Sequence, residues 1–387
     1  MNLKKYKMKK ILIFLFVLIT IISCSNKQNK TKKDLNTKNL DYAHLFQIDN
    51  NKNYTLITTR KKDGTVYNKI LLVKNGIKNN LPKADFIINK PVKSIGVLSS
   101  THIGFLVALN SENLITGCAN PHRIYNKQLQ SRIKDGSIVN IGDDMKCNIE
   151  SMISLKPDVI FTTGFEYNYN TKKILKKAGI PFIPISEWKE SNILGRTEWV
   201  KLFAAFVNKQ KLADSIFKET TSRYNRYKKL AKTFKNKPTI MWGSNFKGTW
   251  YMPGGKSYIG QMLVDAGSNY YFSKDTTKGS IQLNIENVIE NMQDADFWLA
   301  PSAYSISEIK KQDKHYHIFK SLKTRNVFNY DKRMNKNGFN DYWESGIMHP
   351  DIILKDIIHI LHPEAFKNYN SFYFRKIPET SKYKREY

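Results

Sequence analysis

The hydrophobic pattern divides the chain into two parts, with the change near residue 93. Before it, apolar and polar positions alternate with period two, and Asp63-Gly64 supplies a turn, which predicts strands at 44–48, 54–59 and 67–73. After it, short β-branched runs alternate with segments of helical period. The predicted strands are 94–98, 114–118, 138–141, 158–162 and 182–185, and the predicted helices are 103–109, 127–134, 149–155 and 171–177. Strands separated by helices indicate a largely parallel, three-layer α/β sheet.

A long helical region follows this first α/β unit. Helical periodicity runs from Arg196 to Phe234, with an expected break at residues 208–210. The second piece, residues 210–234, would be about 37 Å long at 1.5 Å per residue, enough to pass from one lobe to another. Alternation then resumes, with strands expected at 239–242, 296–300 and 326–330 and helices at 257–266, 285–292, 306–322 and 349–361. The pattern predicts two similar α/β lobes joined by one helix.

Two segments of the chain echo each other and support this division. Residues 148–153 read N-I-E-S-M-I and residues 284–289 read N-I-E-N-V-I, and each precedes an aspartate and then a predicted strand. Matching segments at matching places indicate pseudo-symmetric lobes. The alternative is shared helix-start chemistry, because Asn is a favoured N-cap and Glu in the first turn complements the helix dipole.

The first 23 residues have the pattern of an export signal. Lysines between positions 4 and 10 precede an apolar run at 11–22, which is too short for a stable transmembrane helix. Residues 21–24, I-I-S-C, resemble the lipobox of bacterial lipoproteins, and this resemblance makes Cys24 the lipid-bearing first residue of the mature protein. The polar tract that follows is expected to be a disordered tether.

The chain that remains after the signal is too long for one ordinary domain and fits two lobes. We expect a signal peptide at 1–23, a tether at 24–41, an N-terminal β extension at 42–92, an N-lobe at 93–195, linking helices at 196–236 and a C-lobe at 237–387. Cys118 and Cys147 could form one disulfide, which a core of this size does not require.

The chain is strongly basic, with a formal net charge of +30. Nucleic acid is the first partner that such a charge suggests. The lysines, however, are spread over the whole chain among many asparagines, as A/T-rich codon usage produces, and an exported protein meets little nucleic acid. We therefore expect no nucleic-acid partner. Attraction of an anionic ligand or a membrane surface is the alternative to codon bias.

The sequence contains no recognisable catalytic constellation. Residues 254–257, G-G-K-S, look like the end of a phosphate-binding P-loop, but that motif requires a glycine where Trp250 stands. The dinucleotide, hydrolase-elbow and metalloprotease motifs are absent as well. The histidines do not form the converging set of three or four ligands that a zinc site needs. We therefore predict a protein that is not an enzyme and has no bound metal or cofactor.

Polar and aromatic residues follow several predicted strands. Because open parallel sheets bind ligands at the carboxyl ends of their strands, these residues are candidates for a ligand cleft. They are Ser99, Ser100, Thr101 and His102 after the first N-lobe strand, Phe165 after a later one, and Trp242 after the first C-lobe strand. Arg123, Arg196 and Lys256 are candidate cations for an anionic, partly aromatic ligand. Arg196 could equally have a structural role, and we expect Trp242 to face residues 100–102.

The residues at 94–102, 155–160 (L-K-P-D-V-I), 195–199, 251–258, 340–346 and 362–364 together resemble a known family. It comprises the substrate-binding proteins of iron-complex and vitamin B12 ABC importers, in a lipoprotein form. The resemblance covers about residues 93–364 and implies two Rossmann-like lobes joined by one rigid helix, with the ligand between them. Tyr251 and Trp343, which lie in these segments, join Lys256 among the expected ligand-binding residues, and the resemblance implies that Glu150 and Glu286 dock onto the permease. The surroundings of Arg123 match the family weakly.

The resemblance leaves the ligand open. Positive charge favours an anionic ferric-siderophore complex, whereas haem or cobalamin is carried by other members, and a lipid-anchored enzyme is a third reading. The implied partners are the ABC permease and, through the lipid on Cys24, the membrane. We expect a monomer in the periplasm or cell envelope.

Overall fold

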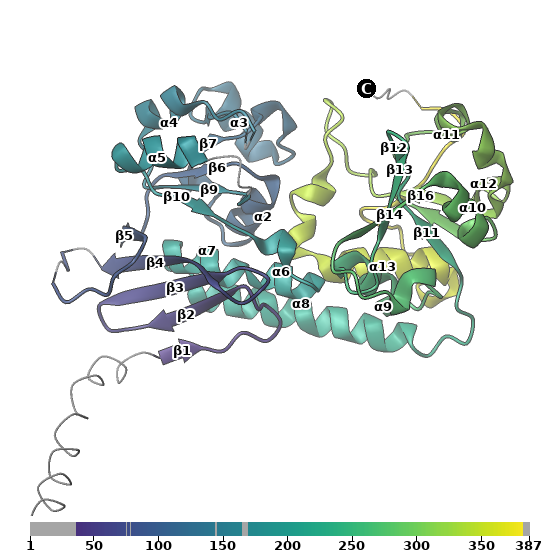
Figure 1. Cartoon of the computed structure of the whole chain (residues 1–387), viewed down its shortest axis with the longest axis horizontal. Helices are drawn as coiled ribbons and strands as arrows, with labels where there is room; N and C mark the ends of the chain where they lie inside the picture. The colour runs from purple at the N-terminus through teal and green to yellow at the C-terminus, as the bar shows by residue number, and fades with distance from the viewer. Residues whose placement is uncertain (1–35, 75, 78, 144, 165–168, 382–387) are drawn as a thin grey trace, which may run out of the picture.

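The computed structural model describes residues 36–381, apart from residues 75, 78, 144 and 165–168. Two α/β lobes stand side by side, and helix α8 (Gln210–Ala231) runs along the base from below the N-lobe to the far end of the C-lobe (Figure 1). At 1.5 Å per residue its length is about 33 Å. The predicted arrangement of two lobes joined by one long helix is therefore confirmed, although this helix ends three residues earlier than expected.

The N-lobe contains a fully parallel sheet with the strand order β10-β9-β6-β7-β8. Its strands are β6 (Ile95–Val97), β7 (Ile115–Cys118), β8 (Val139–Asn140), β9 (Val159–Thr162) and β10 (Phe182–Pro184). Helices α2 (Ser100–Ala108), α3 (Lys127–Lys134), α4 (Ile149–Leu155) and α5 (Tyr169–Lys177) connect them. The central strands are covered on both faces, which explains why they appeared as continuous apolar runs.

The C-lobe repeats this plan with additions. Its main sheet has the order β11 (Ile240–Trp242), β15 (Phe297–Leu299), β16 (Val327–Asn329) and β17 (Arg375–Lys376), of which the last is antiparallel. A second, antiparallel sheet consists of β12 (Asn245–Phe246), β13 (Thr249–Pro253) and β14 (Ser280–Leu283). The helices are α9 (Tyr258–Asp265), α10 (Ile285–Met292), α11 (Ile306–Gln312), α12 (Lys320–Lys323) and α13 (Pro350–Leu361).

The predicted helix at 306–322 is not continuous. It ends at Gln312, a short 3-10 helix follows at Lys314–Ile318, and α12 begins at Lys320. Asp313 has an extended backbone, and its side chain accepts a hydrogen bond from the backbone N–H of His315. An Asp that caps a new turn in this way interrupts the helix, because its carboxylate competes for the backbone donors.

The N-terminal residues form a five-stranded sheet rather than three strands. Its strands are β1 (Asn36–Lys38), β2 (Phe46–Asn50), β3 (Tyr54–Arg60), β4 (Val66–Lys74) and β5 (Phe86–Lys90), in that spatial order. The prediction of a disordered tether up to residue 41 is wrong for β1, which pairs with β2. Lys38 also forms an ion pair of 2.5 Å with Asp214 on α8, so this part of the chain is attached to the base.

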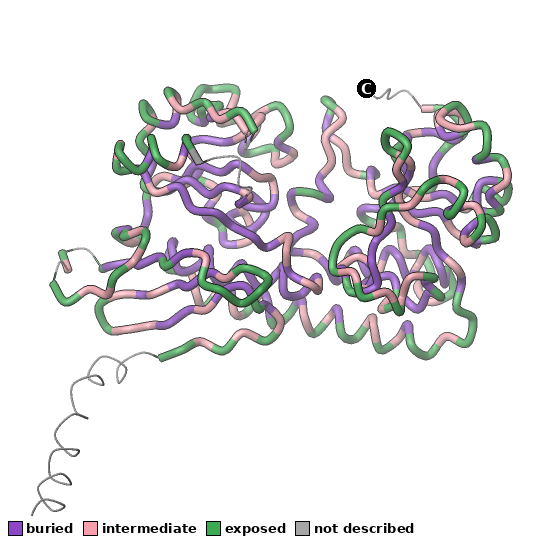
Figure 2. The backbone as a smooth tube through the Cα atoms, viewed as in Figure 1, coloured by how far each residue is buried: buried purple, intermediate pink, exposed green. Residues whose placement is uncertain are grey.

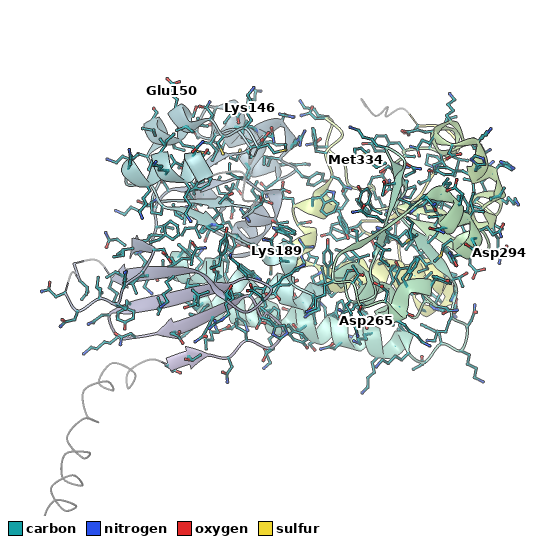
Figure 3. All side chains as sticks on the ribbon, in the orientation of Figure 1. Lys146, Glu150, Lys189, Asp265, Asp294 and Met334 are labelled. Carbon is teal, nitrogen blue, oxygen red and sulfur yellow. The ribbon has the colours of Figure 1, made fainter. Side chains whose placement is uncertain are left out.

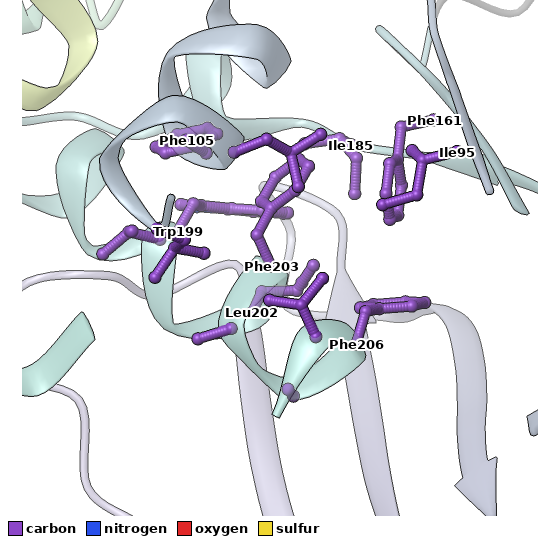
Figure 4. Close-up of a cluster of buried hydrophobic side chains, with 14 of the residues drawn as sticks. Ile95, Phe105, Phe161, Ile185, Trp199, Leu202, Phe203 and Phe206 are labelled. Carbon is purple, nitrogen blue, oxygen red and sulfur yellow. The ribbon is translucent and has the colours of Figure 1, made fainter. Parts of the chain in front are cut away.

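The N-terminal sheet shares one core with the N-lobe. The ring of Phe46 lies 4.8 Å from that of Trp199, which is fully buried. Trp199 precedes α7 (Val200–Val207), a helix that is buried on every side and packs Phe203 and Phe206 against Phe161 of the parallel sheet (Figure 4). Helix α7 thus packs against both sheets, and it is apolar on every face because no face is exposed to solvent.

Two buried carboxylates attach the start of this sheet. Glu198, in α6 (Ile193–Glu198), accepts hydrogen bonds of 2.8–3.0 Å from the backbone N–H groups of residues 41, 42 and 43. Glu190 accepts from residues 44 and 45 and from the indole N–H of Trp199. The N-terminal sheet is therefore a fixed part of the N-lobe.

The break expected at residues 208–210 is present. Asn208 has a φ of 57° and ends α7, so α8 starts in a new direction at Gln210. Figure 2 shows a buried interior in each lobe and an exposed underside of α8. In the described part of the chain, none of the helices combines the length and the apolar character needed to cross a membrane.

Candidate ligand-binding cleft

A cavity of about 310 Å³ lies where the carboxyl ends of β6 and β7 face the C-lobe. The N-lobe contributes Ser99, Ser100, Ile103, Asn120 and Arg123 to its wall, and the C-lobe contributes Phe339, Asn340, Trp343 and Glu344. Open α/β sheets place ligands at this edge. Of the residues predicted to bind a ligand, the structure brings Ser99, Ser100 and Trp343 together here, and it adds Arg123, which had the weaker sequence support.

Ser99 and Ser100 belong to the start of α2. The hydroxyl oxygen of Ser99 caps the helix by accepting a hydrogen bond from the backbone N–H of Thr101 at 3.3 Å. A capped helix start carries partial positive charge from its aligned peptide dipoles. The Arg123 guanidinium lines the same cavity, so its N-lobe wall is electropositive.

Thr101 and His102 do not face the cleft, which corrects their predicted role. Thr101 donates a hydrogen bond of 2.9 Å to the buried carboxylate of Glu187. His102 is fully buried between the rings of Phe161 and Phe203, and burial lowers its pKa to about 3. Because α2 starts at Ser100, successive side chains rotate by about 100° and these two point into the core. A neutral core imidazole cannot contact a ligand in the cleft.

Arg196 is buried as well, so the geometry favours a structural role for this residue over ligand binding. Its guanidinium lies 3.7 Å from the Glu187 carboxylate and 4.3 Å from the centre of the Tyr258 ring. Tyr258 belongs to α9 of the C-lobe, so Arg196 contacts both lobes. Burial raises the pKa of Glu187, and the Arg196 charge opposes that rise.

The aromatic residues of the C-lobe form a connected row beside the cavity. Trp343 is 45% exposed and meets the edge of the Tyr330 ring at 5.5 Å. Tyr330 in turn stacks on Trp242 at 6.3 Å, so half-buried Trp242 stands one ring behind Trp343. Trp343 is therefore the aromatic residue that a ligand in this cavity would meet first.

The remaining predicted ligand residues lie elsewhere. Tyr251 is exposed on β13 and Lys256 is exposed before α9, and within the described structure neither lines the 310 Å³ cavity. Phe165 and Cys24 lie outside the described residues. Asn120, Phe339 and Glu344 were missed, because their proximity depends on loops from two lobes rather than on any local motif.

Glu344 connects the two walls of the cavity. It is 4% exposed, and its two carboxylate oxygens accept hydrogen bonds of 2.8 Å from the backbone N–H groups of Tyr125 and Asn126 in the N-lobe. Burial raises the pKa of Glu344 to about 7. Cys118 lies nearby, and burial together with the Glu344 charge raises its thiol pKa to about 12. Cys118 and Cys147 are not joined in a disulfide.

Glu150 and Glu286 occupy equivalent positions in the two lobes. Each is exposed in the first turn of its helix, α4 or α10, behind an asparagine N-cap. Asn148 and Asn284 both cap by accepting the backbone N–H three residues ahead, at 3.0 and 2.9 Å. Figure 3 shows Glu150 on the face of the N-lobe turned away from α8. The echoed segments therefore share helix-start chemistry and also present two matching carboxylates.

The described residues contain no group of three or more His, Cys, Asp or Glu side chains that could hold a metal ion. His315 and His317 lie in the short 3-10 helix, where His315 contacts Asp313.

Comparison with known proteins places these features in a family. A family model described as periplasmic binding protein matches residues 95–334. A lipoprotein of Methanocaldococcus jannaschii is 32% identical over 75% of this chain and 70% of its own length. Among solved structures, a periplasmic solute-binding protein of Veillonella parvula has a TM-score of 0.54 at 18% identity, covering 81% of this chain and 88% of its own. The molybdate-binding protein MolA of Haemophilus influenzae has a TM-score of 0.55 at 21% identity, covering 73% of this chain and 89% of its own.

Proposed function

Because this chain belongs to the periplasmic binding protein family, we propose that it is the substrate-binding lipoprotein of an ABC importer and captures a ferric-siderophore-type complex between its lobes. Members of this family bind solutes and work with ABC permeases; they are not enzymes. The observation that supports the choice of ligand is the cavity shared by both lobes, with Arg123 on one wall and Trp343 on the other.

These two walls suit a ligand that is both anionic and aromatic. Arg123 and the start of α2 offer positive charge to carboxylate or catecholate oxygens. Trp343 offers an exposed ring face, and stacking on an aromatic side chain is worth about 1–3 kcal/mol in well-measured systems. A siderophore that holds iron through aromatic anionic groups would use both walls at once. Haem and cobalamin would use the aromatic wall but supply less negative charge to Arg123.

A small oxyanion is a second candidate, and the cavity volume favours it. Pockets for drug-sized ligands have volumes of about 300–1,000 Å³, so a cavity of about 310 Å³ is at the lower end of that range. MolA of Haemophilus influenzae, which has a similar fold, was solved with molybdate bound. An oxyanion would depend on Arg123 and the α2 start and would gain little from Trp343.

Calorimetric titration separates these candidates. The panel is ferrichrome, a ferric tris-catecholate complex, haem, cyanocobalamin, molybdate and ferric chloride. We expect tight binding of a ferric siderophore, with a loss of about 5- to 150-fold in Trp343→Ala. Tyr271→Ala, which removes an exposed ring that does not line the cavity, should bind as the unchanged protein does. Tight binding of ferric ion alone, or of no panel member, would reject the proposal.

We also propose that Glu150 and Glu286 dock onto the permease. Their exposure at matching helix starts supports this role, since two equivalent carboxylates suit a two-fold symmetric partner. Replacing both with alanine should leave the dissociation constant within about threefold while uptake in cells falls. Glu290→Ala, on the same helix as Glu286, is the control. A large loss of affinity in the double variant would place these residues in the ligand site instead.

Anchoring through Cys24 completes the proposal. The residues before Cys24 resemble a lipobox, and the similar Methanocaldococcus protein is itself called a lipoprotein. The protein would then act as a monomer tethered in the cell envelope. Cys24→Ala should move it from the membrane fraction to the soluble fraction, and unchanged fractionation would show that the lipid is attached elsewhere or not at all.

A further inference from the structure

Residues 331–344 of the C-lobe, here called the bridging segment, cross to the N-lobe. After β16 the chain forms a short hairpin in which Met334 pairs with Asn340, and it stands between the two lobes (Figures 1 and 3). The side-chain oxygen of Asn335 accepts the N–H groups of residues 337 and 339 and so fixes the turn. The hairpin meets residues 120–126, the loop between β7 and α3, which we call the Arg123 loop.

The backbone of the Arg123 loop is held from the other lobe at four residues. Glu344 accepts the N–H groups of Tyr125 and Asn126 at 2.8 Å each. The side-chain amide of Asn335 donates to the carbonyl oxygen of Ile124 at 3.1 Å, and that of Asn337 donates to the carbonyl oxygen of His122 at 3.1 Å. Side chains of the C-lobe therefore help to set the position of this loop, together with Gln130 of α3, whose amide donates to the same Ile124 carbonyl oxygen at 2.8 Å.

The bridging segment also contacts the Arg123 side chain, which in addition interacts electrostatically with Asp143 of its own lobe. Its guanidinium lies 5.2 Å from the centre of the Phe339 ring, a cation–π distance, and that ring also meets His122 at 5.4 Å. Arg123 is otherwise exposed, and a long exposed side chain without such a contact would sample many rotamers. Phe339 thus keeps the Arg123 charge at the cavity.

Glu344 is itself fixed. Its backbone packs so closely on α2 that Gly104 has no room for a side chain, because a Cβ there would collide with the Glu344 carbonyl oxygen. Three residues later, the carbonyl oxygen of Ile347 accepts a hydrogen bond of 2.8 Å from Thr197 in α6. Because these backbone contacts fix the position of residue 344, its carboxylate can fix the position of the loop whose N–H groups it accepts.

We propose that Glu344 is a positioning residue for ligand binding, which holds the Arg123 loop so that the Arg123 guanidinium faces the cleft. The C-lobe then fixes the Arg123 part of the N-lobe wall. Moving the lobes apart would break the hydrogen bonds to Glu344 and would release the Arg123 loop from the ligand. This inference rests on the proposed function for the use of the cleft, but the hold of Glu344 on the loop is independent of ligand identity.

A purely structural role for Glu344 is the competing explanation, and Glu190 supplies a matched control. Glu190 is also a buried glutamate that accepts two backbone N–H groups, but its donors, His44 and Leu45, lie directly before β2 of the N-terminal sheet. Glu190→Gln and Glu344→Gln each replace one acceptor oxygen with an amide that cannot accept. Both variants should lose stability, whereas effects on the Arg123 loop should be confined to Glu344→Gln.

The first arm of the test needs no ligand. Residue-resolved hydrogen exchange on the whole chain measures how often the N–H groups of Tyr125 and Asn126 open. We expect exchange at these two amides, measured above pH 7 where Glu344 is ionised, to rise roughly 10- to 100-fold in Glu344→Gln, because one N–H loses its acceptor and the other keeps only a neutral one. Exchange at both amides should be unchanged in Glu190→Gln. Unchanged exchange at Tyr125 and Asn126 in Glu344→Gln would overturn the proposal.

The second arm is a double-mutant cycle on affinity, with every panel compound that the unchanged protein binds. Arg123→Ala should weaken binding about 10- to 100-fold and Glu344→Gln about 5- to 20-fold. If Glu344 acts through Arg123, the double variant should bind within about twofold of Arg123→Ala alone. If the loss of affinity in the double variant equals the product of the losses in the two single variants, Glu344 does not act through Arg123. If no compound binds the unchanged protein, the proposed function fails, and the exchange arm alone still decides whether Glu344 holds the loop.

Discussion

The junction at the base of the N-lobe and the junction between the lobes use the same chemistry. At the base, Glu198 and Glu190 accept hydrogen bonds from the N–H groups of residues 41–45 and so attach the N-terminal sheet. Between the lobes, Glu344 accepts those of Tyr125 and Asn126. In both places a buried carboxylate satisfies backbone donors that lie outside a helix or sheet.

Glu198 and Glu344 differ in how their negative charge is balanced, whereas Glu190 resembles Glu344 in having a pKa that burial raises. Glu198 has the ammonium of Lys201 at 2.5 Å, so its charge is paired. Glu344 has no ion pair within the described structure, and burial, with a smaller contribution from the charge of Asp341, raises its pKa to about 7. A paired carboxylate makes a permanent attachment, whereas an unpaired one near its pKa makes an attachment that conditions can alter.

The base junction should be the costlier one to break. Glu198→Ala leaves three N–H groups without their acceptor and leaves the buried Lys201 ammonium with only the exposed Asp41 carboxylate, 3.9 Å away. Breaking a buried ion pair by removing one partner costs about 3–5 kcal/mol. We expect the free energy of unfolding, measured with urea, to fall by that amount, while the affinity for the cleft ligand is unchanged in the protein that remains folded. A loss below about 1 kcal/mol would mean that the N-terminal sheet is held by packing alone.

The junction between the lobes should respond to pH. The folded-state pKa of Glu344 is raised from 4.5 to about 7, so its contribution to stability is present below pH 4.5 and is lost as pH rises through 7. Relative to Glu344→Gln, the unchanged protein should therefore lose roughly 3 kcal/mol of unfolding free energy between pH 4.5 and 7.5. Buried His102, whose pKa is lowered, acts in the opposite direction but equally in both proteins, so the difference isolates Glu344.

Other ionisable groups surround Glu344. Asp341 and Cys118 interact with it electrostatically, and Arg123, Arg333 and His349 line the cavities on its two sides. Asp341→Asn is the useful companion variant, because removing that negative charge should lower the Glu344 pKa and move the transition to lower pH. A difference curve that is flat from pH 4.5 to 7.5 would show that Glu344 is ionised throughout.

The smallest effect is expected where the attachment is exposed. Lys38 and Asp214 join β1 to α8, but their side chains are 23% and 47% exposed, so solvent screens the pair. Asp214→Asn should change the free energy of unfolding by less than about 1 kcal/mol. A larger loss of unfolding free energy would show that the exposed ion pair stabilises the protein as much as the buried glutamates do.

Elements with their own start signals were predictable from the sequence. Helices α3, α4 and α10 have the predicted bounds, because each follows an asparagine that caps it through a local hydrogen bond. The start of α2 was placed three residues late, at 103 instead of 100, and this put Thr101 and His102 in a loop facing the cleft. An error of less than one turn reversed the direction of two side chains.

The bridging segment could not be predicted from local signals. Glu344 has an acidic side chain in a loop, a combination that is usually exposed, and its partner Asn126 is 218 positions away in the chain. The same holds for Arg123 and Phe339, which meet because two loops from different lobes converge. The resemblance to binding proteins indicated the cleft, but the residues that complete its wall depend on the tertiary structure.

The hold of the bridging segment on the Arg123 loop also limits how the lobes can move. The lobes are joined at the base by α8, above it by Arg196, which contacts both Glu187 and Tyr258, and between them by residues 331–344. Contacts at several separate places leave two bodies little freedom to rotate relative to each other. A wide opening of the cleft would therefore require these contacts to break, including the hydrogen bonds to Glu344.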